Sequence, residues 1–199
     1  MYVYEPLLPL VVGAYLLGSI PFGILLAKLF RLPDPRSIGS GNIGATNMLR
    51  TGNKKVALLT LLLDGGKGAA AVYLAHRIDG YATYVALAVL MAALGHMYSI
   101  WLRFTGGKGV ATLLGGTLAF SWPVGLVFCG VWLLLFVPTR LVSLASIIAL
   151  AAIPVATHVL VSPEAALPMA IASLVAIYKH RANIARLRAG TEPRMGRKA

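Results

Sequence analysis

The run VATLLGGTLAFSWPVGLVFCGVWLLLFV, residues 110–137, decides how often this chain crosses a membrane. A membrane-spanning helix needs about 20 apolar residues, so the run is long for one span and short for two. Ser121, Trp122 and Pro123 offer a break in its middle, because proline disrupts a continuing helix. The run is therefore one long helix or two short ones, and the rest of the chain has to decide between them.

Five further segments are apolar enough to span a membrane. They are Leu7–Phe30, Val56–His76, Tyr81–Leu102, Leu141–Val161 and Ala165–Tyr178. Pro9 and Pro21 predict kinks in the first segment, which lacks the basic n-region of a signal peptide and is read as a retained span. The short connection at 77–80 predicts that the second and third segments form an antiparallel hairpin. The total is six or seven spans.

The basic residues favour seven spans. With that count, all of the 18 Lys and Arg fall on one side except Arg77 and the intramembrane Lys67, while Glu5, Asp79 and Glu164 fall on the other side. By the positive-inside rule the N-terminus is outside and the C-terminus is cytoplasmic. We predict an all-α, polytopic integral membrane bundle of seven transmembrane helices.

The composition excludes a soluble globular domain. Apolar residues make up 58% of the chain, the mean hydropathy is +0.80 and only 12% of residues are charged, against about 25% in soluble domains. The net charge of +12 is interpreted as basic residues on the cytoplasmic side that contact anionic lipid. The sequence lacks the basic stripe with stacking aromatics that would indicate nucleic-acid binding. We predict one domain over 1–192 and a basic, disordered tail over 193–199.

A lone Cys129 offers neither a disulfide nor a thiolate pair, so it is interpreted as a packing residue. No cluster of His, Cys and carboxylate has the spacing of metal ligands. We therefore predict no metal and no cofactor.

The most polar interruption of the apolar chain is RSIGSGNIGATNMLR, residues 36–50. Gly39, Gly41 and Gly44 alternate with hydrogen-bonding side chains, which suits a nest of N–H groups around an anion. Arg36 and Arg50 would add positive charge. The alternative is an ordinary polar connection between helices, rich in Gly and Asn for turn reasons alone.

A second Gly-rich segment, Thr105–Gly109, directly precedes the fourth span. A phosphate there would meet backbone N–H groups, a helix N-terminus and the Lys108 ammonium together. The segment is not a Walker A loop, because GxxxxGK[ST] and a preceding strand are missing. A basic turn at the membrane surface is the alternative.

Two ionisable groups, Asp64 and Lys67, lie three residues apart on one face of the second span. Charges at that depth are costly and face an interior or a wet cavity, so structural pairing and a site role both remain open. His96, seven residues before Arg103, is within reach of a cytoplasmic pocket or is a hydrogen-bonded core residue.

The tail KHRANIARLRAGTE continues the last span as a short amphipathic helix with Gly190 as its stop. His180 and Asn183 share one face of it. An interfacial helix that binds anionic lipid is the alternative. With seven spans, this tail and both Gly-rich loops share the cytoplasmic face.

Several motifs together resemble one family. They are GSIPFG at 18–23, GSGNIGATN at 39–47 followed by Arg50, LDGGKG at 63–68, GHMY at 95–98, FTGGKGVAT at 104–112 and HRANIARLRAGTE at 180–192. In order and spacing, across the whole chain, they resemble the bacterial acyl-phosphate-dependent glycerol-3-phosphate acyltransferases, the PlsY family. The resemblance implies a multi-pass protein of the bacterial inner membrane. It also implies acyl transfer from acyl phosphate to the sn-1 hydroxyl of glycerol 3-phosphate, giving lysophosphatidic acid and phosphate in the first step of phospholipid synthesis.

The resemblance also assigns roles by position. The implied catalytic residues are Ser40, Arg50, Lys108, His180 and Asn183. The substrate- and phosphate-binding residues that we expect are Gly39, Gly41, Asn42, Gly44, Thr46, Asn47, Lys67, His96, Gly106, Gly107 and Gly109. Asp64 and Glu192 are expected to be structural.

No His is followed five residues later by Asp, so the HxxxxD motif of acyl-CoA-type glycerolipid acyltransferases is missing, which argues against that class of enzyme. The expected partners are acyl phosphate, glycerol 3-phosphate and membrane lipids, and the expected oligomeric state is a monomer.

Two readings from other classes remain. A transporter of an organic phosphate would use Gly and Pro within spans and an intramembrane pair such as Asp64 and Lys67. It would also want a site near the membrane midplane, whereas these polar motifs gather on one face. A noncatalytic lipid scaffold would explain the basic face but not the Gly-rich loops.

Overall fold

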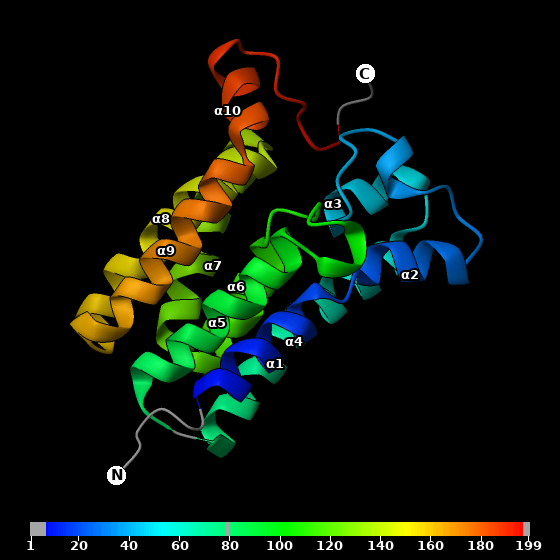
Figure 1. Ribbon diagram of the computed structural model, residues 1–199. Coiled ribbons are helices and arrows are strands. Elements are labelled where there is room, and N and C mark those ends of the chain that lie inside the picture. The colour runs from blue at the N-terminus through cyan, green and yellow to red at the C-terminus, as the bar shows by residue number, and fades with distance from the viewer. Residues whose placement is uncertain (1–6, 79, 197–199) are drawn as a thin grey trace.

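The computed structural model describes residues 7–78 and 80–196, and within these ranges it contains helices and connecting coil but no strand (Figure 1). The α-helices are α1 (Leu7–Ser19), α2 (Phe22–Leu29), α3 (Ala45–Met48), α4 (Lys54–Ile78), α5 (Ala82–Met97), α6 (Val110–Phe120), α7 (Trp122–Thr139), α8 (Val142–Leu160), α9 (Pro163–Lys179) and α10 (Arg181–Arg188). Three short 3-10 turns are η1 (Pro35–Ser37), η2 (Leu49–Thr51) and η3 (Ile100–Leu102). The predicted all-helical fold is confirmed for the described residues.

Helix α5 lies at the centre of the bundle. It packs against α1, α4, α6 and α9, while α7, α8 and α9 pack in succession beside it (Figure 1). Val85, Ala86 and Val89 of α5 are fully buried, whereas large apolar side chains such as Leu134 and Val159 point outward. An apolar exterior around a close-packed interior is what a lipid-facing bundle requires.

The run at 110–137 forms two helices, as its central break allows. α6 ends at Phe120, Ser121 has an extended backbone with φ −154°, and α7 begins at Trp122 with Pro123 in its first turn. Among the residues that the structure describes, five segments are long and apolar enough to cross a membrane: Leu7–Leu29, Lys54–Ile78, Ala82–Leu102, Trp122–Thr139 and Val142–Leu160. α6 has 11 residues and α9 has 17, so both are shorter than those five.

Two apolar segments are broken inside the bundle. The predicted kink at Pro21 is confirmed, since α1 ends at Ser19 and α2 begins at Phe22. Pro9 is the third described residue of α1, next to the residues outside the described ranges, so the kink predicted there stays a prediction. The third segment is also interrupted, between Met97 and Ile100.

Side chains satisfy the backbone carbonyls at these breaks. Lys67 Nζ donates to Ile20 O at 2.8 Å, and Ser99 Oγ donates to Ser19 O at 2.6 Å. The Tyr15 hydroxyl donates to Tyr98 O, also at 2.6 Å. Because lipid offers no hydrogen bonds, such partners are what allows a helix to break at membrane depth.

The crossing of α1 and α5 depends on Gly95. A Cβ there would collide with the backbone of α1 between Tyr15 and Ser19, which cannot move without displacing the helix. Gly95→Leu is expected to lower the free energy of unfolding in detergent by about 3 kcal/mol. Gly13→Leu, on exposed α1 surface with nothing nearby, is the control, and equal losses in the two variants would contradict this packing argument.

Some predicted features fall outside the described ranges: Glu5, Asp79, Arg197 and Lys198, whose membrane side was predicted, and the last three residues of the tail. Within the description, 193–196 is coil, and Met195 N donates to Arg140 O at 2.9 Å. Disorder of the 193–199 tail and the 1–192 domain limits stay predictions.

Candidate active site

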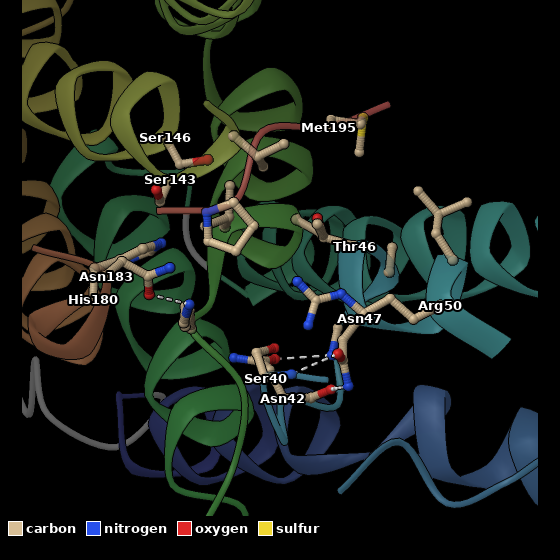
Figure 2. Close-up of a pocket in the computed structure, with 18 of the residues that line it drawn as sticks. Ser40, Asn42, Thr46, Asn47, Arg50, Ser143, Ser146, His180, Asn183 and Met195 are labelled. Carbon is tan, nitrogen blue, oxygen red and sulfur yellow. Dashed lines mark hydrogen bonds between the residues drawn. The ribbon is translucent and has the colours of Figure 1, made fainter. Parts of the chain in front are cut away.

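A cavity of about 580 Å³ lies where four segments meet: the loop before α3, the start of α6, the start of α8, and α10 with the coil after it. Figure 2 shows the side chains around it. The three polar segments singled out in the sequence thus converge. The predicted site residues that line the cavity are Ser40, Asn42, Gly44, Thr46, Asn47, Arg50, Asp64, His96, Lys108, Gly109, His180, Asn183 and Glu192. The cavity's lining does not include Gly39, Gly41, Lys67, Gly106 or Gly107.

Asn47 organises the loop that presents Ser40. Its Nδ2 donates to Pro35 O at 2.6 Å, to Asn42 O at 2.8 Å and, more weakly, to Ile38 O at 3.2 Å. Its Oδ1 accepts from Ser40 N at 3.0 Å. One buried amide therefore fixes both ends of the turn around Ser40, as Figure 2 shows.

The glycines of this loop act differently from the expected anion nest. Gly39 and Gly41 do adopt positive φ, of 54° and 67°. However, Gly41 N donates to Ile38 O and Gly44 N donates to Asn42 Oδ1, each at 2.9 Å. The N–H groups of Gly41 and Gly44 therefore stabilise the loop itself, and an anion site at the backbone of this loop stays a prediction. Ser40, Gly44 and Thr46 of this loop line the cavity.

Arg50 lies back across the same loop. A Cβ at Gly39 would collide with the Arg50 guanidinium and with Asn47 Oδ1. Because Gly39 has no side chain, the Arg50 side chain can lie over the loop, next to the cavity (Figure 2).

In the second Gly-rich loop, only its last part reaches the cavity. Gly107 N donates to His96 O at 3.1 Å, and a Cβ at Gly106 would collide with the backbone of His96 and Met97. These two glycines pack the loop onto the end of α5. The sequence predicted that N–H groups of this loop contact a phosphate, but the Gly107 N–H already donates to His96 O. Lys108 and Gly109 line the cavity together with the first residues of α6, whose N-terminal N–H groups lack intrahelical partners.

A chain of hydrogen bonds joins Lys108 to the tail. Lys108 Nζ donates to Asn183 Oδ1, and Asn183 Nδ2 donates to Glu192 Oε1 at 2.6 Å. Arg186 Nε donates to Glu192 Oε2 at 2.7 Å. Glu192 thus secures α10 and the following coil against the cavity, and the stop at Gly190 is confirmed by its φ of 69°.

Burial tunes two bases in this cavity. Burial lowers the pKa of the Lys108 ammonium to about 8, although the Glu192 carboxylate opposes the shift. Burial also lowers the pKa of His180 to about 4, with a further lowering from the Lys108 charge. His180 is therefore neutral at pH 7. Its Nδ1 lies 2.8 Å from Ala176 O and must donate to it, which leaves Nε2 as an acceptor.

The carboxyl of Glu192 stays ionised. Burial raises the pKa of this group, but hydrogen bonds, including those from Asn183 and Arg186, outweigh burial and hold the pKa below its ordinary value. Its negative charge partly balances Lys108 and Arg186 when the cavity holds no anion.

Asp64 and His96 line the cavity, whereas Lys67 contacts both of them without being part of the lining. Lys67 Nζ is 2.8 Å from Asp64 Oδ1 and 2.9 Å from His96 Nδ1. The sequence left open whether Asp64 and Lys67 pair structurally or serve a site. They do pair, and His96 joins the pair to the cavity.

Sequence reasoning missed the wall made by α8 and the coil after α10. Ser143 and Ser146, in the first turns of α8, line the cavity opposite Ser40 (Figure 2). Arg186 of α10 and Arg194 of the coil after it also line the cavity. The apolar sequence around the two serines does not identify them as site residues. The one available signal is that they lie near the N-terminus of a predicted span, where backbone N–H groups can bind an anion.

In the described ranges, no group of three or more His, Cys, Asp or Glu could hold a metal ion. The cavity is lined by ammonium, guanidinium, hydroxyl, amide, imidazole and carboxylate groups. Fold and cavity together define an integral membrane protein with a cavity at one end of its helical bundle that is lined by cationic and hydrogen-bonding side chains.

Comparison with known proteins specifies the class further. The family model described as glycerol-3-phosphate acyltransferase matches residues 8–190. The chain is 50% identical over 184 residues to the glycerol-3-phosphate acyltransferase of Jannaschia sp. (strain CCS1), covering 92% of this chain and 90% of that protein. It is 52% identical over 193 residues to the enzyme of the same name from Rhodospirillum rubrum, and the alignment covers 94% of this chain and 89% of that protein.

Solved structures agree. The crystal structure of PlsY (YgiH), an integral membrane glycerol 3-phosphate acyltransferase, in its glycerol 3-phosphate form, has a TM-score of 0.89 and 42% identity over 96% of each chain. The lysophosphatidic acid form has a TM-score of 0.86 and 40% identity. This chain belongs to the glycerol-3-phosphate acyltransferase family, the integral membrane acyltransferases of phospholipid synthesis.

Proposed function

We propose that this chain transfers a fatty acyl group from acyl phosphate to the sn-1 hydroxyl of glycerol 3-phosphate. The acceptor oxygen forms a bond to the carbonyl carbon, and the bond from that carbon to the phosphate oxygen breaks. Phosphate leaves with the electron pair, and the product is lysophosphatidic acid. The observation that carries this proposal is one cavity lined by Arg50, Lys108 and a neutral His180, which suits two phosphorylated substrates.

The proposed roles follow from charge and reach. Lys108 and Arg50 bind phosphate groups, and Ser40 orients the acyl carbonyl or its phosphate. His180 Nε2 and Asn183 position the acceptor hydroxyl. Because an acyl phosphate already has a good leaving group, alignment and charge stabilisation provide most of the rate.

The proton of the acceptor is proposed to go to a substrate phosphate. A phosphate monoester has a second pKa near 6, so it is the stronger base beside His180, whose pKa is about 4. The Ser40 hydroxyl has no His or carboxylate partner among the described residues, which disfavours a covalent acyl-serine. Isolation of an acyl-Ser40 intermediate would overturn that preference.

The identity of the donor is tested on purified protein in lipid or detergent. Acyl phosphate and acyl-CoA are supplied separately with labelled glycerol 3-phosphate, and lysophosphatidic acid and phosphate are measured. We expect turnover with acyl phosphate only. Turnover with acyl-CoA alone would contradict the proposed donor, and uptake of glycerol 3-phosphate into vesicles without acylation would favour transport.

The rate should depend on pH through Lys108. As pH rises through about 8, the ammonium loses its proton and its attraction for phosphate, so kcat/KM should fall on the alkaline side. On the acid side, protonation of the substrate phosphate near pH 6 sets the limit, because His180 stays neutral down to about 4. In Lys108→Arg, whose guanidinium keeps its charge, the alkaline fall should disappear; a fall unchanged by this substitution would exclude Lys108 as its origin.

We further propose a monomer that crosses the bacterial inner membrane seven times, with the N-terminus outside and the cavity on the cytoplasmic face. α6 rises about 16 Å, roughly half the hydrocarbon core, so it completes its crossing together with the Gly-rich loop before it.

Labelling with an impermeant thiol reagent tests this topology in a Cys129→Ser background. Arg77→Cys and Val161→Cys should react from outside, and Arg188→Cys only after the membrane is opened. If α6 does not cross, Val161→Cys and Arg188→Cys exchange their behaviour.

A further inference from the structure

Three ionisable side chains form a buried cluster inside the bundle. The side chains of Lys67, Asp64 and His96 are 1%, 3% and 4% exposed. They link α4 to α5 at the cavity, which Asp64 and His96 help to line. Charges held inside a membrane protein are costly, and the acyl transfer proposed above leaves this cluster without a task.

The contacts of Lys67 fix which nitrogen of His96 carries a proton. An ammonium has three donors and no acceptor. Lys67 Nζ hydrogen-bonds Ile20 O at 2.8 Å and His96 Nδ1 at 2.9 Å, and it forms an ion pair with Asp64 Oδ1 at 2.8 Å. Because Lys67 can only donate to Nδ1, this nitrogen must offer its lone pair. The neutral ring then carries its proton on Nε2.

The other edge of the ring points toward the Gly-rich loop. A Cβ at Gly107 would collide with His96 Nε2 and with the two ring carbons bonded to it. Gly107 N is held by His96 O at 3.1 Å, so ring and loop are joined at two points. His96 also lines the cavity, as does Lys108, the next residue of the loop.

We propose that His96 is a neutral hydrogen-bond donor, through Nε2–H, to a phosphoryl oxygen of a substrate bound beside Lys108. Asp64 and Lys67 are positioning residues that keep the proton on Nε2. A neutral donor strengthens phosphate binding without a second positive charge next to Lys108. The identity of the ligand rests on the proposed function, and the chemistry that His96 recognises is a phosphate monoester or an acyl phosphate.

This assignment changes the role that the sequence suggested for Lys67. Lys67 was expected to bind substrate, yet it is not part of the cavity lining, and its ammonium is held by Ile20 O, His96 Nδ1 and the Asp64 carboxylate. Its effect on the substrate passes through the ring of His96.

The tautomer can be measured without any turnover. Protein labelled with ¹⁵N in its four histidines is studied by NMR in detergent at pH 7, and His96→Gln identifies the signals of His96. We expect a protonated Nε2 and an unprotonated Nδ1. A proton on Nδ1, or on both nitrogens, would overturn the proposal.

Lys67→Met adds a second measurement on the same signals. Without the ammonium, Asp64 Oδ1, 3.5 Å from Nδ1, becomes the nearest acceptor, so the proton should move to Nδ1. A tautomer that is unchanged in the folded variant would show that Lys67 does not set it. If Lys67→Met does not fold, the wild-type spectrum and the comparison of His96→Gln with His96→Asn still test whether Nε2 is a hydrogen-bond donor.

His96→Gln and His96→Asn separate a donor from a structural ring. The amide of Gln reaches the place of Nε2, and the shorter amide of Asn reaches only the place of Nδ1. We expect KM for the phosphate ligand to be about tenfold higher in His96→Asn than in His96→Gln. Equal KM values in two folded variants would contradict a donor at Nε2.

Ligand titration identifies the phosphate. Inorganic phosphate, glycerol 3-phosphate and a long-chain acyl phosphonate, which resists transfer, are added separately to the labelled protein. The ligand that shifts the Nε2 signal is the one that His96 contacts, and no shift with any of them overturns the proposal. A phosphate-dependent shift in protein that transfers no acyl group would leave the donor role intact and refute the proposed reaction instead.

Discussion

Lys108→Met is expected to lower kcat/KM for acyl transfer about 100- to 1000-fold, the usual effect of removing one charged group that stabilises developing negative charge. Lys108 Nζ is half-buried in the cavity, and its hydrogen bond to Asn183 holds it beside the start of α6. Methionine keeps the length and apolar character of the stem but removes the charge. The measurement is initial-rate kinetics with each substrate varied in turn.

Lys55→Met is the matched control for this result. Lys55 is exposed in the first turn of α4 and is not part of the cavity lining, so the same change of charge there should leave kcat/KM at the wild-type value. Asn183 keeps its bond to Glu192 in the Lys108 variant, so α10 stays in place. A loss of less than tenfold in folded Lys108→Met would remove Lys108 from the proposed phosphate site.

The helices could be predicted because apolar length alone identifies them. Two of the interruptions were marked by proline, at Pro21 and at Pro123, and the structure breaks close to both. The interruption after Met97 has no such mark. It depends on Tyr15, a donor from α1, and no local pattern in the sequence shows a contact made over that separation.

The site could be predicted as a set of polar segments but not as a geometry. The segments around Ser40, Lys108 and His180 were recognisable because polar, Gly-rich or basic runs stand out in an apolar chain. The sequence of these segments did not show which backbone N–H groups are free to bind a ligand. Gly41 and Gly44 use theirs inside the loop, and Gly107 uses its own on α5.

Asn47→Asp is expected to lower kcat/KM at least about 100-fold, although Asn47 differs from Asp only in one terminal atom. The Nδ2 group donates to three carbonyl oxygens, of Pro35, Ile38 and Asn42. A carboxylate oxygen in that place would face three acceptors at hydrogen-bonding distance and leave them unsatisfied in a buried position. The loop that carries Ser40 should then lose its shape, with a lower thermal midpoint and reduced protection of Ser40 N in hydrogen exchange.

Asn53→Asp separates this effect from the charge itself. Asn53 Oδ1 accepts from Val56 N at 3.1 Å at the start of α4, and an aspartate oxygen can accept the same bond, so its activity should match that of the wild type. If Asn47→Asp kept the wild-type exchange of Ser40 N but lost activity, Asn47 would act on the substrate directly. If it kept both, the loop would be held by its glycine turns, and the central role of this amide in shaping the site would be refuted.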